Sequence, residues 1–230
     1  MKGIRALPDH LKGKAVFIVG NGQSKRFYNI STLARYGLIF ACNTAFKDHP
    51  VDVLGFRDDD TLKPCSRFPG IKCTWIQAPT RKDGAYIAHA EPVFGWEYID
   101  DNRPSRAADE INPNAPSHPD WGKGDVVKRG STGFILAQIA LRLGAPVIIL
   151  VGCDCGRLPG FTSTKTTEND AGQLRGPLHD RYEKFAFQFE ALCARARAKG
   201  SKLFKLGVFG EVKVPILQPE DLLNLEVIRP

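Results

Sequence analysis

The sequence predicts an α/β fold in which a mostly parallel sheet carries helices on both faces. Short apolar segments of strand length alternate along the chain with longer segments of helical periodicity, an order typical of parallel sheets. The segment 147–151 contains no polar residue, as expected for a strand that is covered on both sides. The 230 residues suit a single domain spanning positions 1–230.

Six strands and three helices are expected. The strands cover 15–19, 38–42, 52–56, 72–76, 147–151 and 202–206, and the helices lie near 25–36, 132–143 and 178–199. The helix near 132–143 is apolar on nearly all sides, which predicts burial against the sheet. The last helix carries one apolar stripe in steps of four and three, formed by Leu178, Tyr182, Phe185, Phe189, Leu192 and Ala196. Gly200 follows, where glycine commonly ends a helix.

Two long segments, 97–130 and 155–177, fit neither a strand nor a helix. The first is rich in Pro, Asn, Asp and Gly, and the second in Thr, Gly and Lys. Loops of this length in compact domains are commonly functional. Both adjoin the edge at which open α/β sheets bind ligands. We expect these segments to form lid loops over a ligand site.

Hydropathy and charge bear on the cellular location of the protein and on its partners. No apolar run is long enough to cross a membrane, and the N-terminal residues lack the apolar segment of a secretory signal, so a cytoplasmic protein is expected. The formal net charge of +7 attracts phosphate-bearing partners without identifying them. The positive residues are scattered and no nucleic-acid motif accompanies them. A solvated basic surface is the favoured interpretation, and nucleic acid stays open as a partner.

The cysteines and one acidic run are candidate metal ligands. Cys153 and Cys155 lack a second cysteine pair or a histidine pair, so reduced, mostly buried thiols are expected and not a zinc site. Asp58–Asp60 follow the third strand and resemble the DxD motif with which some sugar-nucleotide transferases hold Mg²⁺ or Mn²⁺. Three aspartates after a strand are more often a solvated turn. No metal ligand is therefore predicted, and a divalent metal is left open.

The first strand leads into a glycine-rich turn, Gly20-Asn21-Gly22-Gln23-Ser24. A strand, a tight turn and a helix in this order direct backbone N–H groups and a helix N-terminus to one point, where they favour phosphate. Glycine lets the backbone approach a ligand closely, and Ser24 is a suitable N-cap. The turn is a candidate site for a nucleotide-type ligand, and the alternative is a tight turn with no ligand.

The turn does not predict NAD or a P-loop. Lys25 occupies the place of the third glycine in the dinucleotide fingerprint. The second strand ends in Cys42-Asn43-Thr44, with an amide where a carboxylate would hold the ribose. A GxxxxGK[ST] run is also missing from the sequence.

A second candidate anion site is Gly130-Ser131-Thr132-Gly133, after Arg129. Hydroxyl residues between glycines at a helix start offer N–H and O–H donors, although an ordinary N-cap has the same sequence pattern. The strand at 147–151 ends in Gly152-Cys153-Asp154. This order places a carboxylate at the edge of the sheet where the first turn is expected, so Asp154 is a predicted catalytic residue.

His179 is the other predicted catalytic residue. It opens the helix near 178–199 and stands beside the apolar stripe of that helix. The positive end of the helix dipole favours the neutral imidazole, the form that a general base requires. An exposed first-turn histidine without a role is the alternative.

Several motifs occur in one order: VFIVGNGQS, FACNTAF, VDVLGF, GSTGFILAQIALRLGAPVIILVGCD, and a late histidine before a long helix. The series resembles the bacterial sialyltransferase-like group and its relatives, the DUF115-type proteins. Those relatives include an archaeal 6-hydroxymethylpterin diphosphokinase and many phage-encoded proteins. The resemblance covers about residues 14–225 apart from the two lid loops, and it implies a Rossmann-like domain.

The resemblance also implies roles for particular residues. The nucleotide-binding positions that match are Gly20, Asn21, Gly22, Ser24, Asn43, Ser131, Thr132 and Gly133. His179 matches the base that takes the proton from an acceptor hydroxyl as its oxygen attacks the anomeric carbon. The sialyltransferases need no metal.

One departure from the group concerns the leaving phosphate. The group carries tyrosines soon after its G-x-D motif, whereas here the next tyrosine after Asp154 is Tyr182. Arg157, Lys165 or Arg175 would supply a stabilising positive charge instead. This departure counts against sialic acid as the donor. A diphosphokinase would require Mg²⁺, for which Asp58–Asp60 or Asp154 would serve.

The sequence therefore predicts an enzyme, a nucleotide-sugar-dependent glycosyltransferase that acts on a hydroxyl acceptor, with a modified nucleobase in DNA as one such acceptor. One alternative is a Mg-dependent diphosphokinase acting on a hydroxymethylated heterocycle. Another is a non-catalytic protein that binds nucleotides or nucleic acid. The oligomeric state does not follow from the sequence.

Overall fold

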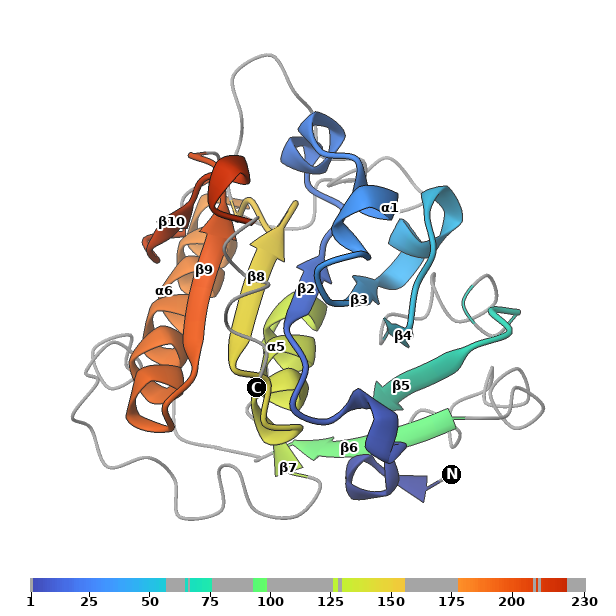
Figure 1. Cartoon of the computed structure of the whole chain (residues 1–230). Coiled ribbons are helices and arrows are strands. Elements are labelled where there is room, and N and C mark those ends of the chain that lie inside the picture. Colours follow the sequence, from blue (N-terminus) through green and yellow to red (C-terminus); the bar gives the residue numbers. More distant parts are fainter. Residues whose placement is uncertain are drawn as a thin grey trace.

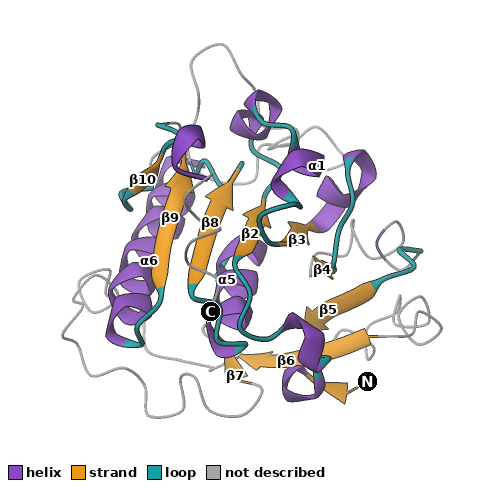
Figure 2. Ribbon diagram, viewed as in Figure 1, coloured by secondary structure: helices purple, strands orange, loops and turns teal. Residues whose placement is uncertain are grey.

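The computed structural model describes residues 2–56, 65, 67–75, 93–98, 126–127, 130–155, 178–208, 210 and 212–222. These residues form a parallel sheet with helices on both faces (Figures 1 and 2). The strands follow the order β1-β6-β5-β4-β3-β2-β8-β9-β10, and β7 pairs with β6. All pairings in the described sheet are parallel. The predicted α/β fold class is confirmed.

The strands are β1 (Lys2–Gly3), β2 (Val16–Val19), β3 (Leu38–Cys42), β4 (Val53–Gly55), β5 (Ile71–Trp75), β6 (Val93–Tyr98), β7 (Val126–Val127), β8 (Val147–Val151), β9 (Lys202–Leu206) and β10 (Ile216–Leu217). The α-helices that the structure describes over their whole length are α1 (Ile30–Leu33), α5 (Thr132–Arg142) and α6 (Leu178–Ala198). The 3₁₀-helices include η1 (Ile4–Ala6), η2 (Asp9–Leu11), η3 (Gln23–Phe27) and η4 (Asn43–Asp48).

All six predicted strands are present, each within one residue of its expected ends. The helix predicted near 25–36 is wrong, because that segment forms η3 and the single turn of α1. Tyr28 between them is extended, with φ −127° and ψ 138°. Asn29 then caps α1, since its side chain accepts from the Thr32 N–H. Asparagine favours this capping geometry over a helix interior.

The first predicted lid loop is partly a strand pair. β6 extends into it as far as Tyr98, and β7 lies near its other end. Glu97 pairs with Val126, and Tyr98 with Val127. The other residues of 97–130 lie outside the described residues except Gly130, and those of 155–177 do so except Cys155.

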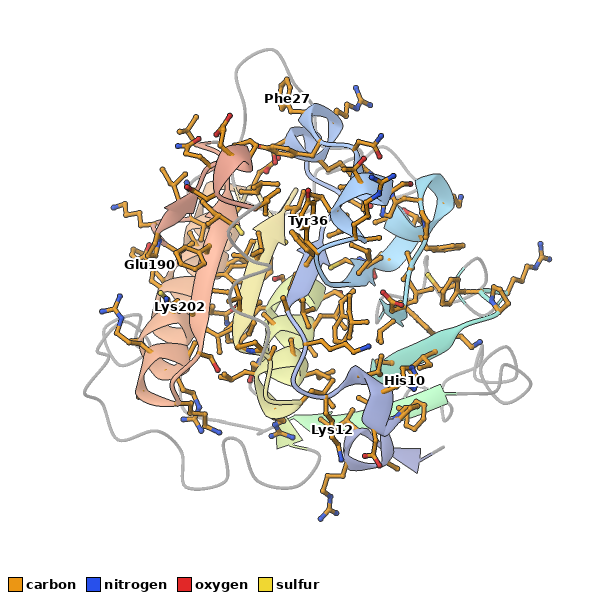
Figure 3. All side chains as sticks on the ribbon, viewed as in Figure 1. His10, Lys12, Phe27, Tyr36, Glu190 and Lys202 are labelled. Atoms are coloured by element: carbon orange, nitrogen blue, oxygen red, sulfur yellow. The ribbon has the colours of Figure 1, made fainter. Side chains whose placement is uncertain are left out.

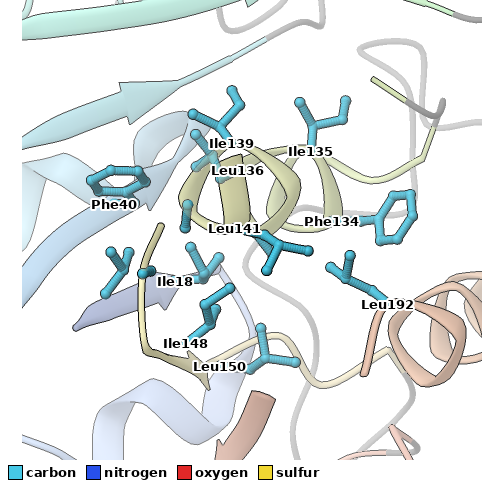
Figure 4. Packing of buried hydrophobic residues seen from close by; sticks show 14 of the residues in the cluster. Ile18, Phe40, Phe134, Ile135, Leu136, Ile139, Leu141, Ile148, Leu150 and Leu192 are labelled. Carbon is cyan, nitrogen blue, oxygen red and sulfur yellow. The ribbon is translucent and has the colours of Figure 1, made fainter. Parts of the chain in front are cut away.

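Two cores fill the two faces of the sheet. Alternate residues of β2 belong to different cores: Val16 and Ile18 pack with α5 and α6, whereas Phe17 and Val19 pack with α1. Every residue of α5 except Arg142 is buried, which confirms the prediction made from its composition. In Figure 4 the α5 side chains cover the strands, and Phe134 points toward α6.

The strand order creates a switch point between β2 and β8. After β2 the chain continues to β3 by way of α1, on one face of the sheet. After β8 it continues to β9 by way of α6, on the other face. Ligands of open α/β sheets bind outside the carboxyl ends of the strands at such a point. None of the described helices is long and apolar enough to cross a membrane.

Candidate functional site

The segments that follow β2 and β8 are hydrogen-bonded to each other at the switch point. The Gly20 N–H donates to the Val151 carbonyl at 2.8 Å, and the Gly22 N–H donates to the Gly152 carbonyl at 2.8 Å. These two groups therefore bond within the protein, whereas the sequence led us to expect them to face a phosphate. A ligand at this edge of the sheet has to be bound mainly by other groups.

Asp154 continues this connection through its side chain. One carboxylate oxygen accepts from the Ser24 N–H at 3.0 Å, and the other accepts from the Ser24 hydroxyl. Both residues are buried, Ser24 at 3% and Asp154 at 8% exposed. Ser24 is the N-cap that the sequence predicts, and this prediction is wrong, because the N-cap of η3 is Gly22. The geometry supports a positioning role for Asp154, which holds the start of η3 against the end of β8.

The glycines of the turn have a structural reason, which is close packing of three chain segments. A Cβ on Gly22 would overlap the Asp154 carboxylate and lie 2.5 Å from the Gly152 oxygen. A Cβ on Gly20 would overlap the same carbonyl. Gly210, which follows β9 with φ +82°, has the Asp154 backbone against it in the same way. Only glycine fits these positions, whether or not a ligand binds nearby.

A cleft of about 470 Å³ opens beside the turn, between η3 and η4. Three of its lining side chains are cations: Lys25 is half-buried, and Arg26 and Lys47 are exposed. The other described lining residues are Asn21, Tyr28, Ile30, Thr44 and His49, so no carboxylate is among them. The cleft therefore combines positive charge with an aromatic ring and hydrogen-bonding groups.

Two contacts connect the cleft to the sheet. The Asn21 side-chain N–H donates to the Thr44 hydroxyl at 3.4 Å, which joins the segments after β2 and β3. The Tyr28 hydroxyl donates to the Leu206 carbonyl at 3.2 Å, at the end of β9. Burial raises the pKa of Tyr28, and the negative charge of Asp154 raises it further. The Tyr28 hydroxyl is thus protonated at neutral pH.

Asn43 lies at the carboxyl end of β3, next to Thr44. Its φ of 51° is left-handed, a conformation that asparagine adopts more readily than most residues. It is 8% exposed, and its Oδ1 has no hydrogen-bond partner within the described part of the chain. An unsatisfied buried acceptor costs about 1–3 kcal/mol. Asn43 is not among the described residues that line the cleft discussed above, so its nucleotide-binding role stays a prediction.

The predicted element Ser131-Thr132-Gly133 forms the start of α5. The Ser131 hydroxyl accepts from the Phe134 N–H at 3.2 Å, so Ser131 is an N-cap. A Cβ on Gly133 would lie 3.1 Å from the Cys153 sulfur and 3.5 Å from the Cys42 sulfur. The start of α5 therefore packs beneath the ends of β3 and β8, next to Asn43 and Asp154. It does not belong to the described lining of the cleft.

Replacing Ser131 with alanine should lower the free energy of unfolding by about 1 kcal/mol, because the Phe134 N–H loses its acceptor. Ser31→Ala is a matched control, since Ser31 is exposed in α1 and the cap of that helix is Asn29. Urea denaturation of both variants measures the difference. An equal effect of the two substitutions would contradict the capping role.

His179 is the second residue of α6. The helix leads through Gly200 into β9, which is parallel to β8, so α6 begins at the carboxyl edge of the sheet (Figure 1). The cleft is lined by residues that follow β2 and β3, at the same edge. The His179 side chain lies outside the described residues, as do Asp58–Asp60, Arg157, Lys165 and Arg175. Among the residues that are described, no group of three or more His, Cys, Asp or Glu is arranged to hold a metal ion.

Sequence reasoning missed most residues of the cleft. Lys25 and Arg26 follow the glycine turn directly, and Lys47 comes four residues after Asn43. A search for cations just after strand ends would have found all three. His49 also lines the cleft, although no sequence motif marks it.

The cysteines agree with expectation, because all six are thiols and four are buried. Burial raises the pKa of Cys42 and Cys73 to about 12. Both thiols are therefore protonated and unreactive at neutral pH.

The sequence matches no protein-family model and no curated protein. Among solved structures, the chain is similar to the sialyltransferase CstII from Campylobacter jejuni, determined in complex with a substrate analogue, CMP-3FNeuAc. The two are 14% identical, the alignment covers 84% of this chain and 81% of that chain, and the TM-score is 0.44. A similarity of this degree assigns no activity to the chain.

Proposed function

We propose that the protein is a glycosyltransferase that takes a sugar from a nucleotide-sugar donor and transfers it to a hydroxyl acceptor. The observation that carries the proposal is the basic cleft between η3 and η4. It lies at the carboxyl edge of a parallel sheet beside the switch point, where such folds bind nucleotides. Its volume of about 470 Å³ suits a ligand of nucleotide size.

The composition of the cleft matches the parts of a nucleotide. Lys25, Arg26 and Lys47 offer charge-assisted hydrogen bonds to phosphate oxygens. Tyr28 and Ile30 supply aromatic and apolar surface for a base or sugar ring. Asn43 lies outside the described lining of the cleft, and its buried Oδ1 is an unsatisfied acceptor at the same edge of the sheet.

The motif order described above supplies the reaction class. In the proposed step, His179 takes the proton from the acceptor hydroxyl as the acceptor oxygen forms a bond to the anomeric carbon. The bond between that carbon and the phosphate oxygen breaks, and its electron pair stays on the phosphate. The basic side chains of the cleft stabilise the departing nucleotide. Asp154 holds the segment that carries Lys25 and Arg26 in place through Ser24.

A thermal-stability panel tests the proposal with CMP, UDP, GDP, AMP, NAD, and ATP with Mg²⁺. A nucleotide at a hundred times its dissociation constant should stabilise the protein by about 2.7 kcal/mol, which is a shift of roughly 5–10 °C for a chain of this length. Asn21→Ala should abolish the shift, because it removes a lining side chain and its bond to Thr44.

Gln218→Ala is the control, since Gln218 is an exposed amide beside β10, at the far end of the sheet. It should leave the shift intact. Stabilisation by no member of the panel would overturn the proposal. Stabilisation by ATP with Mg²⁺ alone would favour a phosphate-transferring enzyme over a glycosyltransferase.

A further inference from the structure

The positions of the cations in the cleft also bear on how many phosphates the ligand has. Lys25 and Arg26 lie on η3, whereas Lys47 lies on η4, so positive charge comes from two different segments. These segments are joined by the hydrogen bond between Asn21 and Thr44. None of the described lining residues is a carboxylate. The ligand therefore meets cations from both sides.

We propose that the donor is a nucleoside diphosphate sugar and not a nucleoside monophosphate sugar. This inference rests on the proposed function and assigns the number of phosphates in its donor. A neutral sugar linked to a nucleoside monophosphate carries one negative charge, on a single phosphodiester. A diphosphate sugar carries two, on adjacent phosphates that can reach cations on both segments.

The same arrangement suits the departure of the sugar. When the bond from the anomeric carbon to the phosphate oxygen breaks, the electron pair stays on that oxygen and the diphosphate gains one negative charge. Cations already in place stabilise the new charge without rearrangement. Arg26 can bind two phosphate oxygens at once, whereas the two lysines act as point charges.

The test compares the dissociation constants of UMP with UDP, GMP with GDP, and CMP with CDP, by calorimetry at low salt. For the base that binds best, we expect the diphosphate to bind about tenfold tighter than the monophosphate, because it places a second phosphate near the cations. The advantage should shrink as salt is raised, since exposed cations are screened.

Two substitutions test whether the cations of the cleft cause the tighter binding of the diphosphate. Lys47→Ala and Lys25→Ala should each weaken diphosphate binding by roughly threefold and change monophosphate binding less. Both side chains are at least partly exposed, so the variants should fold normally, which their melting curves check. Lys202→Ala is the matched control, because Lys202 is an exposed lysine that begins β9 at the opposite edge of the sheet (Figure 3).

The outcomes separate the inference from the proposed function. Equal affinity for mono- and diphosphates of one base would overturn the inference and leave a nucleotide site in place. A diphosphate advantage that survives both lysine substitutions would also overturn it, because the second phosphate would then bind elsewhere. If neither form binds for any base, the proposed function fails and the inference fails with it.

Discussion

Replacing His179 with alanine is expected to lower turnover by roughly 10²- to 10⁴-fold, the usual contribution of a general base. The dissociation constant of the nucleotide should not change, because the proposed base acts on the acceptor and not on the donor. The measurement is the rate at which nucleotide is released from the sugar donor identified by the binding panel, with a calorimetric titration of the same variant.

The control for this variant is His10→Ala. His10 is an exposed histidine in η2, which precedes β2 and so lies at the amino edge of the sheet (Figure 3). Its loss should leave turnover unchanged. An unchanged rate in His179→Ala would remove the base from the proposed mechanism. Weaker nucleotide binding in that variant would instead show that His179 contacts the donor.

Gly22→Ala should lower the free energy of unfolding by about 3 kcal/mol and the melting temperature by about 10 °C. The new methyl group would overlap the Asp154 carboxylate and the Gly152 carbonyl. The turn would have to move away to remove this overlap, and that movement would weaken the hydrogen bonds from Ser24 to Asp154. Overpacking costs about 1–3 kcal/mol, and lost bonds to a buried carboxylate add to it.

Gly13→Ala separates this overlap from backbone strain. Gly13 has φ +67°, yet a Cβ there would meet no atom within 4 Å. It should cost only about 1 kcal/mol, from the left-handed conformation alone. Urea denaturation of both variants gives the difference. Equal losses would mean that the turn tolerates a side chain and that its glycines are not required by packing.

The longer strands could be predicted because their physical signal is local. β3 and β8 are continuous apolar runs of five residues, the expected pattern for strands buried in a parallel sheet. The two-residue strands β1, β7 and β10 are too short to leave a pattern in the sequence. β6 was missed because Gly95 and Glu97 interrupt its apolar residues.

The segment 25–36 shows where local reasoning failed. Its composition permits a helix, but its course depends on bonds to residues far away in the sequence. Ser24 is held by Asp154, and Tyr28 is held by Leu206. Both partners lie on strands or strand ends that the turn meets only in the folded chain. These bonds favour a short 3₁₀-helix and an extended residue over a continuous helix.

The sequence by itself determined the sheet, the buried helix α5, and the edge at which Gly20–Ser24, Asn43, Ser131 and Asp154 would meet. Hydrophobic periodicity and strand-end position decide these features. Only the tertiary structure decided which groups at that edge bond within the protein and which line the cleft. It turned the N–H groups of Gly20 and Gly22 inward and bonded Asp154 to Ser24. It also gathered Lys25, Arg26 and Lys47 around one cleft, because contacts between separate loops depend on packing in three dimensions.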